Sequence, residues 1–139
     1  GPLLNLKGVV IGLNAAVANG AENIGFALPI NQVKKGLFDT KKFGKIIYPF
    51  LGVRYEMVEN GAKLVHGQNG EPAVVDGSPA YKTGLKEGDI ITKFGDKQVN
   101  KDTPLAKLIQ ERQVGDAVNL TILRDGAEVI LQTTLVERK

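Results

Sequence analysis

The chain has 139 residues, a formal net charge of +3 and no cysteine, and 42% of its residues are hydrophobic. This length and composition predict one ordinary soluble domain with some tens of residues to spare. The lack of cysteine excludes disulfides, thiolate metal sites and cysteine catalysis, and no apolar run approaches the roughly 18 residues of a membrane span.

Residues 1–31 predict two β segments, at 9–17 and 24–30, because apolar residues dominate both. Asn19 and Gly20 lie between them. Asn-Gly is the preferred pair for a tight hairpin, since both positions tolerate a positive φ. We therefore expect a β-hairpin at the start of the chain.

Residues 32–48 are rich in lysine and only weakly helical in pattern. Val33, Leu37 and Phe38 could share one helix face, and Gly44 and Pro49 mark the end of the segment. We interpret the segment as a linker that contains a helix. Its lysines are sparse and lack interleaved aromatic residues, so we expect no nucleic-acid partner.

Residues 49–139 are predicted to be the main domain. Leu51, Val53, Tyr55 and Met57 alternate with their neighbours at the period of two of a half-buried strand. Further strands are expected at residues 63–65, 73–75, 117–123 and 128–136. Turn pairs that predict hairpin tips lie between strands, at Asn60-Gly61, Asn69-Gly70 and Asp125-Gly126.

Two helices are marked by their end residues. Ser78 before Pro79 is typical of a helix start, and Gly84 is typical of a helix end, with Leu85 placed to pack back on the last turn. A second helix is expected to start at Thr103-Pro104, to run through residue 112 and to present one apolar stripe of Leu105, Leu108 and Ile109. The predicted fold class is α+β, a small antiparallel β-barrel or sandwich capped by two helices.

Four motifs carry a family resemblance through their order: Gly-Leu-Lys-Glu-Gly-Asp-Ile-Ile-Thr-Lys-Phe-Gly-Asp at 84–96, Thr-Pro-Leu at 103–105, Val-Gly-Asp at 114–116 and Arg-Asp-Gly at 124–126. In this order they resemble the PDZ domain of the HtrA/Deg family of serine proteases. The resemblance implies a PDZ-like fold at 49–139.

Residues 1–29 extend the resemblance to the C-terminal end of that family's trypsin-like protease domain. Residues 1–14 resemble the stretch after the catalytic serine, which would lie two residues before Gly1. The strand that lines the specificity pocket would include Asn23, Ile24, Gly25, Phe26 and Ala27. Because nucleophilic catalysis needs a serine, a base and an orienting group, this chain is expected to hold no catalytic residue. Its one histidine, His66, is expected to be an exposed loop residue.

The PDZ resemblance implies a site for an extended peptide that adds as a strand. Phe50, Leu51, Gly52 and Val53 would form the loop that binds the peptide carboxylate, where Gly52 allows close approach of the backbone. The implied pocket for the last side chain is lined by Leu51, Val53, Leu105, Leu108 and Ile109. Arg54 is a further candidate for a groove contact. Plain core packing is the alternative interpretation of the apolar positions.

Three functions stay open. The chain is a peptide-binding module that reads C-termini or unfolded chains, an assembly interface without a free ligand, or part of a serine endopeptidase whose catalytic residues lie elsewhere. Residues 1–31 lack the other strands of their barrel, and an unpaired apolar strand edge invites association. We therefore expect them to pack back on the PDZ domain, to pair between copies of the chain, or to stay poorly ordered. No cofactor or metal is expected, the loop at 60–72 is taken as a surface insertion, and the family resemblance implies an extracytoplasmic location.

Overall fold

The computed structural model describes residues 1–17 and 24–139, so the predicted turn at Asn19-Gly20 lies outside the described residues. The chain divides into two compact units, Gly1–Ile47 and Tyr48–Lys139. Among the described residues, no helix is both long and apolar enough to cross a membrane.

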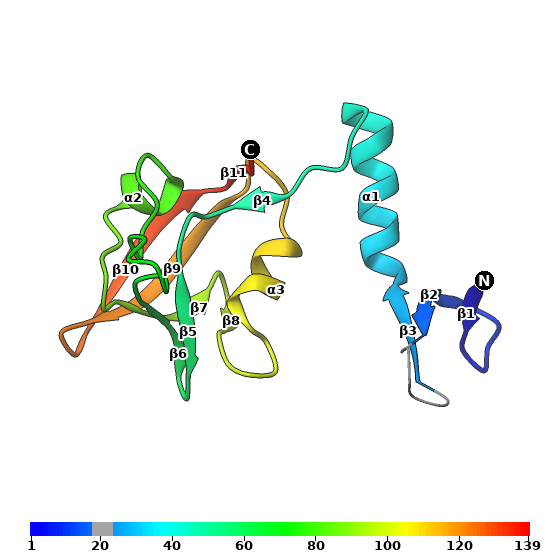
Figure 1. Cartoon of the computed structure of the whole chain (residues 1–139), viewed down its shortest axis with the longest axis horizontal. Helices are drawn as coiled ribbons and strands as arrows, with labels where there is room; N and C mark the ends of the chain where they lie inside the picture. The colour runs from blue at the N-terminus through cyan, green and yellow to red at the C-terminus, as the bar shows by residue number, and fades with distance from the viewer. Residues whose placement is uncertain (18–23) are drawn as a thin grey trace. The chain divides into compact units, whose positions relative to one another are not determined.

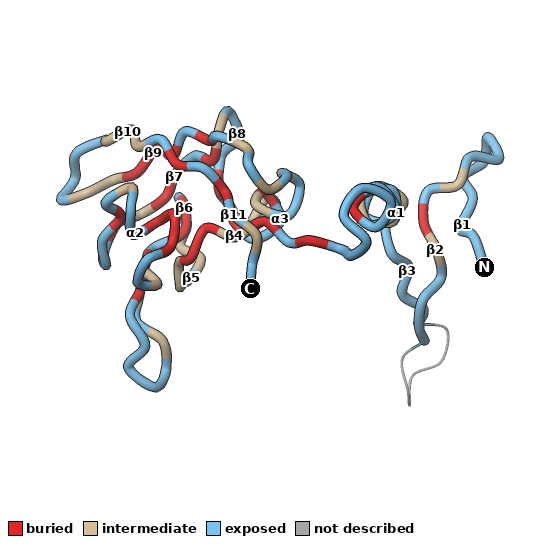
Figure 2. The backbone as a smooth tube through the Cα atoms, turned by 90° about the horizontal axis from the view of Figure 1, so that it is seen from above, coloured by how far each residue is buried: buried red, intermediate tan, exposed pale blue. Residues whose placement is uncertain are grey.

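The first unit contains an antiparallel sheet of three strands, β1 (Pro2–Leu4), β2 (Val10–Val17) and β3 (Gly25–Pro29), in that order (Figure 1). The predicted segments at 9–17 and 24–30 become β2 and β3, while β1 was not predicted. A Cβ at Gly12 would approach the Leu28 carbonyl oxygen to 2.9 Å, so this glycine allows the close register of the two strands. Most of the backbone here is exposed (Figure 2).

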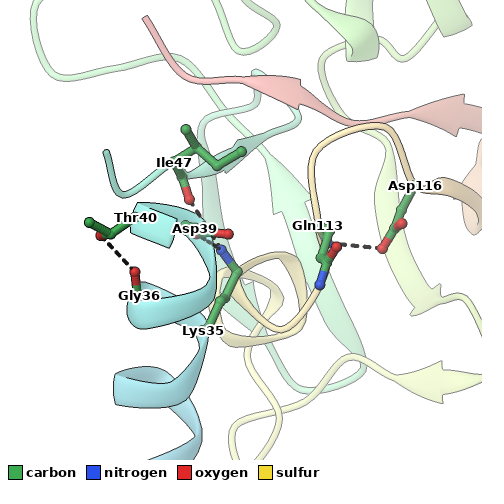
Figure 3. Close-up of polar contacts among 7 residues, drawn as sticks. All are labelled: Lys35, Gly36, Asp39, Thr40, Ile47, Gln113 and Asp116. Carbon is green, nitrogen blue, oxygen red and sulfur yellow. Dashed lines mark hydrogen bonds and ion pairs between the residues drawn. The ribbon is translucent and has the colours of Figure 1, made fainter. Parts of the chain in front are cut away.

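The predicted linker segment holds a regular helix, α1 (Ile30–Phe43), that begins directly after β3. Gly44 ends it in a left-handed conformation, and its N–H donates to the Thr40 carbonyl at 2.9 Å. Lys35 donates to Asp39 at 2.8 Å and to the carbonyl of Ile47 at 3.1 Å (Figure 3). Leu37 and Phe38 are 67% and 48% exposed, whereas Asp39 is 2% exposed, so the buried group of this helix is a paired carboxylate.

The second unit is built on an antiparallel sheet in the order β10-β9-β7-β6-β5, with β8 added beside β7. Its strands are β5 (Tyr55–Val58), β6 (Gly61–Leu64), β7 (Ile90–Phe94), β8 (Lys97–Gln98), β9 (Ala117–Arg124) and β10 (Ala127–Thr134). The predicted hairpin at Asp125-Gly126 is present, and it joins β9 to β10 in full register. A separate pair, β4 (Pro49–Phe50) with β11 (Val136–Glu137), joins the two ends of the unit.

The alternating strand predicted from Leu51 to Met57 is wrong as one strand. It is interrupted between β4 and β5, where Val53 makes only an isolated bridge to Val74. Gly52 lies in this break with a φ of +89°, a conformation that redirects the chain. The strand predicted at 73–75 is reduced to the same bridge.

Both predicted helices are present, and the second is shorter than expected. Helix α2 (Pro79–Thr83) has the predicted Ser78 cap, whose Oγ accepts from the Tyr81 N–H at 3.2 Å. Helix α3 (Leu105–Gln110) ends two residues before the predicted position. Thr103 does not cap it, because its hydroxyl donates to the Gln98 carbonyl at 2.6 Å. Helix α2 contacts β10, while α3 lies on the other side of β5 (Figure 1).

The second unit encloses one hydrophobic core. Val118, Leu120 and Ile122 alternate inward along β9 and pack with Phe94, the largest of its fully buried side chains. This unit is the predicted PDZ-like α+β fold with two covering helices. In the part of the chain that is described, its strands form open sheets and not a closed barrel.

Candidate functional site

The site predicted from the sequence lies where an edge strand meets a helix. Strand β5 ends the sheet order, so among the described strands only β6 pairs with it. Helix α3 lies beside β5, and the hydroxyl of Tyr55 accepts a hydrogen bond from the N–H of Ala106 at 3.0 Å. An unpaired strand edge has free N–H and C=O groups, which makes it a place where another chain can add.

The turn before β5 is fixed by hydrogen bonds from α2 and the segment before it. The Leu51 carbonyl accepts from Ala80 at 2.9 Å and the Gly52 carbonyl accepts from Val75 at 2.9 Å, while the Arg54 N–H donates to Ala73 at 2.7 Å. None of these bonds uses the N–H groups of Leu51, Gly52 or Val53. The turn is therefore held in place by the carbonyl groups of Leu51 and Gly52 and by the Arg54 N–H.

Gly52 is required by its surroundings within the unit. A Cβ at this position would lie 2.2 Å from the Cβ of Ser78 and 2.5 Å from its Oγ, distances at which atoms overlap. The left-handed φ adds strain for any side chain. The resemblance explained Gly52 by ligand approach, and the structure adds a second reason, contact with the cap of α2.

The predicted pocket residues divide into two groups by exposure. Leu51, Leu105 and Leu108 are 1%, 0% and 3% exposed, so they belong to the hydrophobic core of the unit. Val53 and Ile109 are half-buried and pack against that core with one side only. The three leucines are therefore core residues, and Val53 and Ile109 lie nearer to solvent. The assignment of these five residues to a peptide pocket stays a prediction.

Arg54 lies away from α3. Its Nη1 donates to the Pro72 carbonyl at 2.8 Å, and its side chain lines a cleft with residues of α2 and β10. Adjacent residues of an extended segment point to opposite sides, so Arg54 and Tyr55 diverge. The predicted contact of Arg54 with a bound peptide stays a prediction.

The predicted remnant of a specificity pocket is only partly described. Asn23 lies outside the described residues, Ile24 precedes β3, and Gly25, Phe26 and Ala27 belong to that strand. All four described residues are exposed. Their assignment to a specificity pocket stays a prediction.

An ion pair that sequence reasoning missed fixes the other end of α2. Arg124 donates through Nε and Nη2 to the two oxygens of Asp89, at 2.8 and 2.7 Å, and through Nη2 to the Gly84 carbonyl at 2.8 Å. The hydrogen bond to Asp89 raises the pKa of Arg124. Asp89 is 2% exposed and also accepts from the Lys86 N–H at 2.8 Å. The motifs at 84–96 and 124–126 contain both partners, and only their pairing was unseen.

His66 is exposed, as predicted, but it has a partner. Its Nδ1 pairs with the carboxylate of Glu87 in the turn after α2, and both side chains are about half exposed. Within the described residues, no group of three or more potential ligands could hold a metal ion.

Comparison with known proteins confirms the resemblance to PDZ domains and to HtrA/Deg proteases. A profile described as PDZ domain matches residues 49–135. The chain is 37% identical to a probable periplasmic serine endoprotease DegP-like of Rickettsia prowazekii, in an alignment that covers 94% of the chain and 27% of that protein. It is 33% identical to the serine protease Do-like HtrB of Bacillus subtilis, covering 99% of the chain and 33% of that protein.

A solved structure described as the HtrA-type protease AlgW with decapeptide has the same fold. It matches with a TM-score of 0.74 at 22% identity, over 99% of this chain and 45% of that one. The chain thus spans about a third of the length of the curated relatives named above, 27% and 33%.

Proposed function

The chain belongs to the PDZ domain family, and we propose from this premise that residues 49–139 bind the C-terminal or extended apolar segment of another polypeptide. The ligand adds as an antiparallel strand to the free edge of β5, beside α3. Its carboxylate is bound by the N–H groups of Leu51, Gly52 and Val53. Its last side chain enters between Val53 and Ile109, above the buried leucines.

The proposal is supported by an edge strand, β5, and by the fixed turn that precedes it at Gly52. The edge of β5 is free among the described strands, and the turn is bonded through the groups that the proposed ligand does not need. Such preorganisation lowers the entropic cost of binding, because the loop does not have to be ordered by the peptide. The related AlgW structure is described with a decapeptide, which agrees with this mode.

The resemblance to HtrA/Deg proteases is confirmed by the named relatives, which match nearly the whole chain. We therefore propose that the chain is the C-terminal end of a protease domain followed by its PDZ domain, within a serine endopeptidase. In that protein the peptide site would regulate or feed the protease domain. Because a relative is named periplasmic, we further propose an extracytoplasmic location.

The test is a titration of the full chain with fluorescent peptides that end in Val, Ile, Leu, Phe or Ala, each with a free and an amidated C-terminus. We expect at least one free-acid peptide to bind, and amidation to weaken it by tenfold or more. Ile109→Glu should abolish binding because it places a charge on the groove wall.

The matched control is Ile130→Glu, since Ile130 is 66% exposed on β10 and lies outside the groove. Melting temperatures verify that both variants fold. If no peptide binds, or if amidation and Ile109→Glu change nothing, the chain is not a peptide reader of this kind.

A second function, association through residues 1–31, is favoured by the exposed apolar side chains of the first unit. Ile24, Phe26 and Leu28 are 49%, 59% and 49% exposed, and exposed apolar surface of this kind drives association. Sedimentation velocity across a hundredfold concentration range tests it. Growth of a dimer that Phe26→Ser removes supports association, whereas a concentration-independent monomer refutes it.

A further inference from the structure

A cleft lies between α2 and β10, apart from the proposed peptide groove. It has a volume of about 1060 Å³ and is lined by residues of α2, β10 and β11 and of the loop that precedes α2. None of the described residues that line it belongs to β5 or α3. Ligand pockets in proteins measure about 300–1,000 Å³, so this cleft has room for several residues of an extended chain.

Basic side chains dominate the charged lining of this cleft. Lys82 is an exposed residue in the last turn of α2. Arg54 is half-buried, and its Nη1 donates to the Pro72 carbonyl at 2.8 Å, which fixes the guanidinium at the wall. The four cationic and two acidic residues of the lining are Arg54, Lys82, Arg138, Lys139, Asp76 and Glu137. A cleft with an excess of one charge concentrates ligands of the opposite charge, so this one favours an anionic ligand.

Strand β10 gives the cleft a free sheet edge. It ends the sheet order, and among the described strands only β9 pairs with it. Directly after β10, the Leu135 N–H donates to the Asp116 carbonyl at 3.0 Å and its carbonyl accepts from Gly115 at 2.8 Å, so its backbone faces β9. Backbone groups face alternate edges along an antiparallel strand. Those of Gln132 and Thr134, which both line the cleft, therefore face the free edge.

A buried hydroxyl without a partner also lines this cleft. Thr133 is 3% exposed, and its Oγ1 makes no hydrogen bond in the described structure. A buried polar atom without a partner is costly, and each such case in a folded protein calls for an explanation. A ligand acceptor at the floor of the cleft would supply the missing partner.

We propose that this cleft is a second binding site, which takes an acidic, extended segment of another polypeptide. The backbone of the segment adds to the free edge of β10, and its carboxylates pair with Arg54, Lys82 and Arg138. A small anion would use the charges alone and leave the strand edge unpaired, so a peptide is the better occupant. The site does not rest on the proposed function, because it uses neither β5 nor a terminal carboxylate.

The experiment titrates the full chain with a fluorescent pentapeptide that alternates glutamate and valine and is blocked by acetyl and amide groups. The amide removes the free carboxylate that the proposed groove on β5 would bind. A control peptide has glutamine in place of each glutamate. We expect the glutamate peptide to bind roughly tenfold more tightly, because charge-assisted hydrogen bonds are the stronger ones. Its affinity should fall as salt is added, since salt screens the exposed charges.

Lys82→Glu should weaken the glutamate peptide by roughly tenfold, because it reverses a charge at the wall of the cleft. The matched control is Lys101→Glu, which changes the net charge equally at an exposed residue outside the cleft and should leave the affinity unchanged. Thr133→Val should not lower the melting temperature, since its hydroxyl has no described partner, yet it should weaken peptide binding. Unchanged affinity in Thr133→Val would refute the role assigned to that hydroxyl.

The inference is wrong if the two peptides bind equally or not at all. It is also wrong if Lys82→Glu and Lys101→Glu have the same effect, because binding then follows net charge alone. Loss of the glutamate peptide in Ile109→Glu would place it in the groove beside α3, and this too would overturn the inference. Should Lys82→Glu not fold, Arg138→Glu replaces it, since Arg138 lines the same cleft after the last strand.

Discussion

Replacing Arg124 by methionine should strongly destabilise the second unit. The substitution keeps the aliphatic stem but removes two hydrogen bonds to Asp89 and one to the Gly84 carbonyl. Asp89 is 2% exposed and would keep only the Lys86 N–H as a described donor. A buried carboxylate without its cation is costly, because neither water nor a counter-ion compensates its charge.

The expected loss is about 3 kcal/mol, at the lower end of the values for buried pairs, because the Arg124 side chain is 28% exposed and solvent screens part of the interaction. For a unit of this size each kcal/mol corresponds to roughly 4–8 °C in melting temperature, so we expect a decrease of roughly 12–24 °C. The raised pKa of Arg124 keeps its guanidinium charged at ordinary pH, and the stabilisation that this shift contributes is lost as pH rises through that pKa.

Thermal and urea unfolding of the full chain, followed by circular dichroism, measure the effect. The matched control is Lys97→Met, because Lys97 pairs with Glu111 at 3.4 Å with both side chains about half exposed. Such a pair contributes about 0–1 kcal/mol. If Arg124→Met costs no more than Lys97→Met, the buried pair does not stabilise the fold as argued. The double variant with Asp89→Asn should recover part of the loss, since it removes the orphaned charge.

Three further predictions concern the turn before β5 and the residues that support it. Gly52→Ala should weaken peptide binding by tenfold or more and lower the melting temperature. The control Gly88→Ala, at a φ of +85° with open space around it, should cost only the backbone strain of about 1–2 kcal/mol. Equal effects of the two variants in calorimetry and peptide titration would contradict the argued contact with Ser78. Ser78→Ala should cost about 1 kcal/mol through loss of the α2 cap, measured by urea unfolding, and no change would show that the Tyr81 bond contributes nothing. Leu105→Ala should cost about 2–5 kcal/mol because this side chain is 0% exposed, and a loss below about 1 kcal/mol would place it outside the core.

Local sequence signals gave the right elements where short-range chemistry decides structure. Helix α2 begins after Ser78, at Pro79, and ends before Gly84, and the β9–β10 hairpin turns at Asp125-Gly126. Both were predicted because caps and tight turns depend on neighbouring residues alone. The period-two pattern from Leu51 to Met57 was misleading. The pattern indicates which side chains face the core, but it does not indicate that the turn at Gly52 divides the segment.

The sequence by itself determined the family, the bounds of α2, the β9–β10 hairpin and a set of candidate pocket residues, because these depend on motif order and on local pattern. Only the tertiary structure decided which of those residues are buried and which lie nearer to solvent, why Gly52 has to be a glycine, and that Arg54 lies away from α3. It alone paired Asp89 with Arg124 and Tyr55 with Ala106, 35 and 51 positions apart. Contacts over such separations depend on how sheet and helix pack together, and no local pattern in the chain encodes that packing.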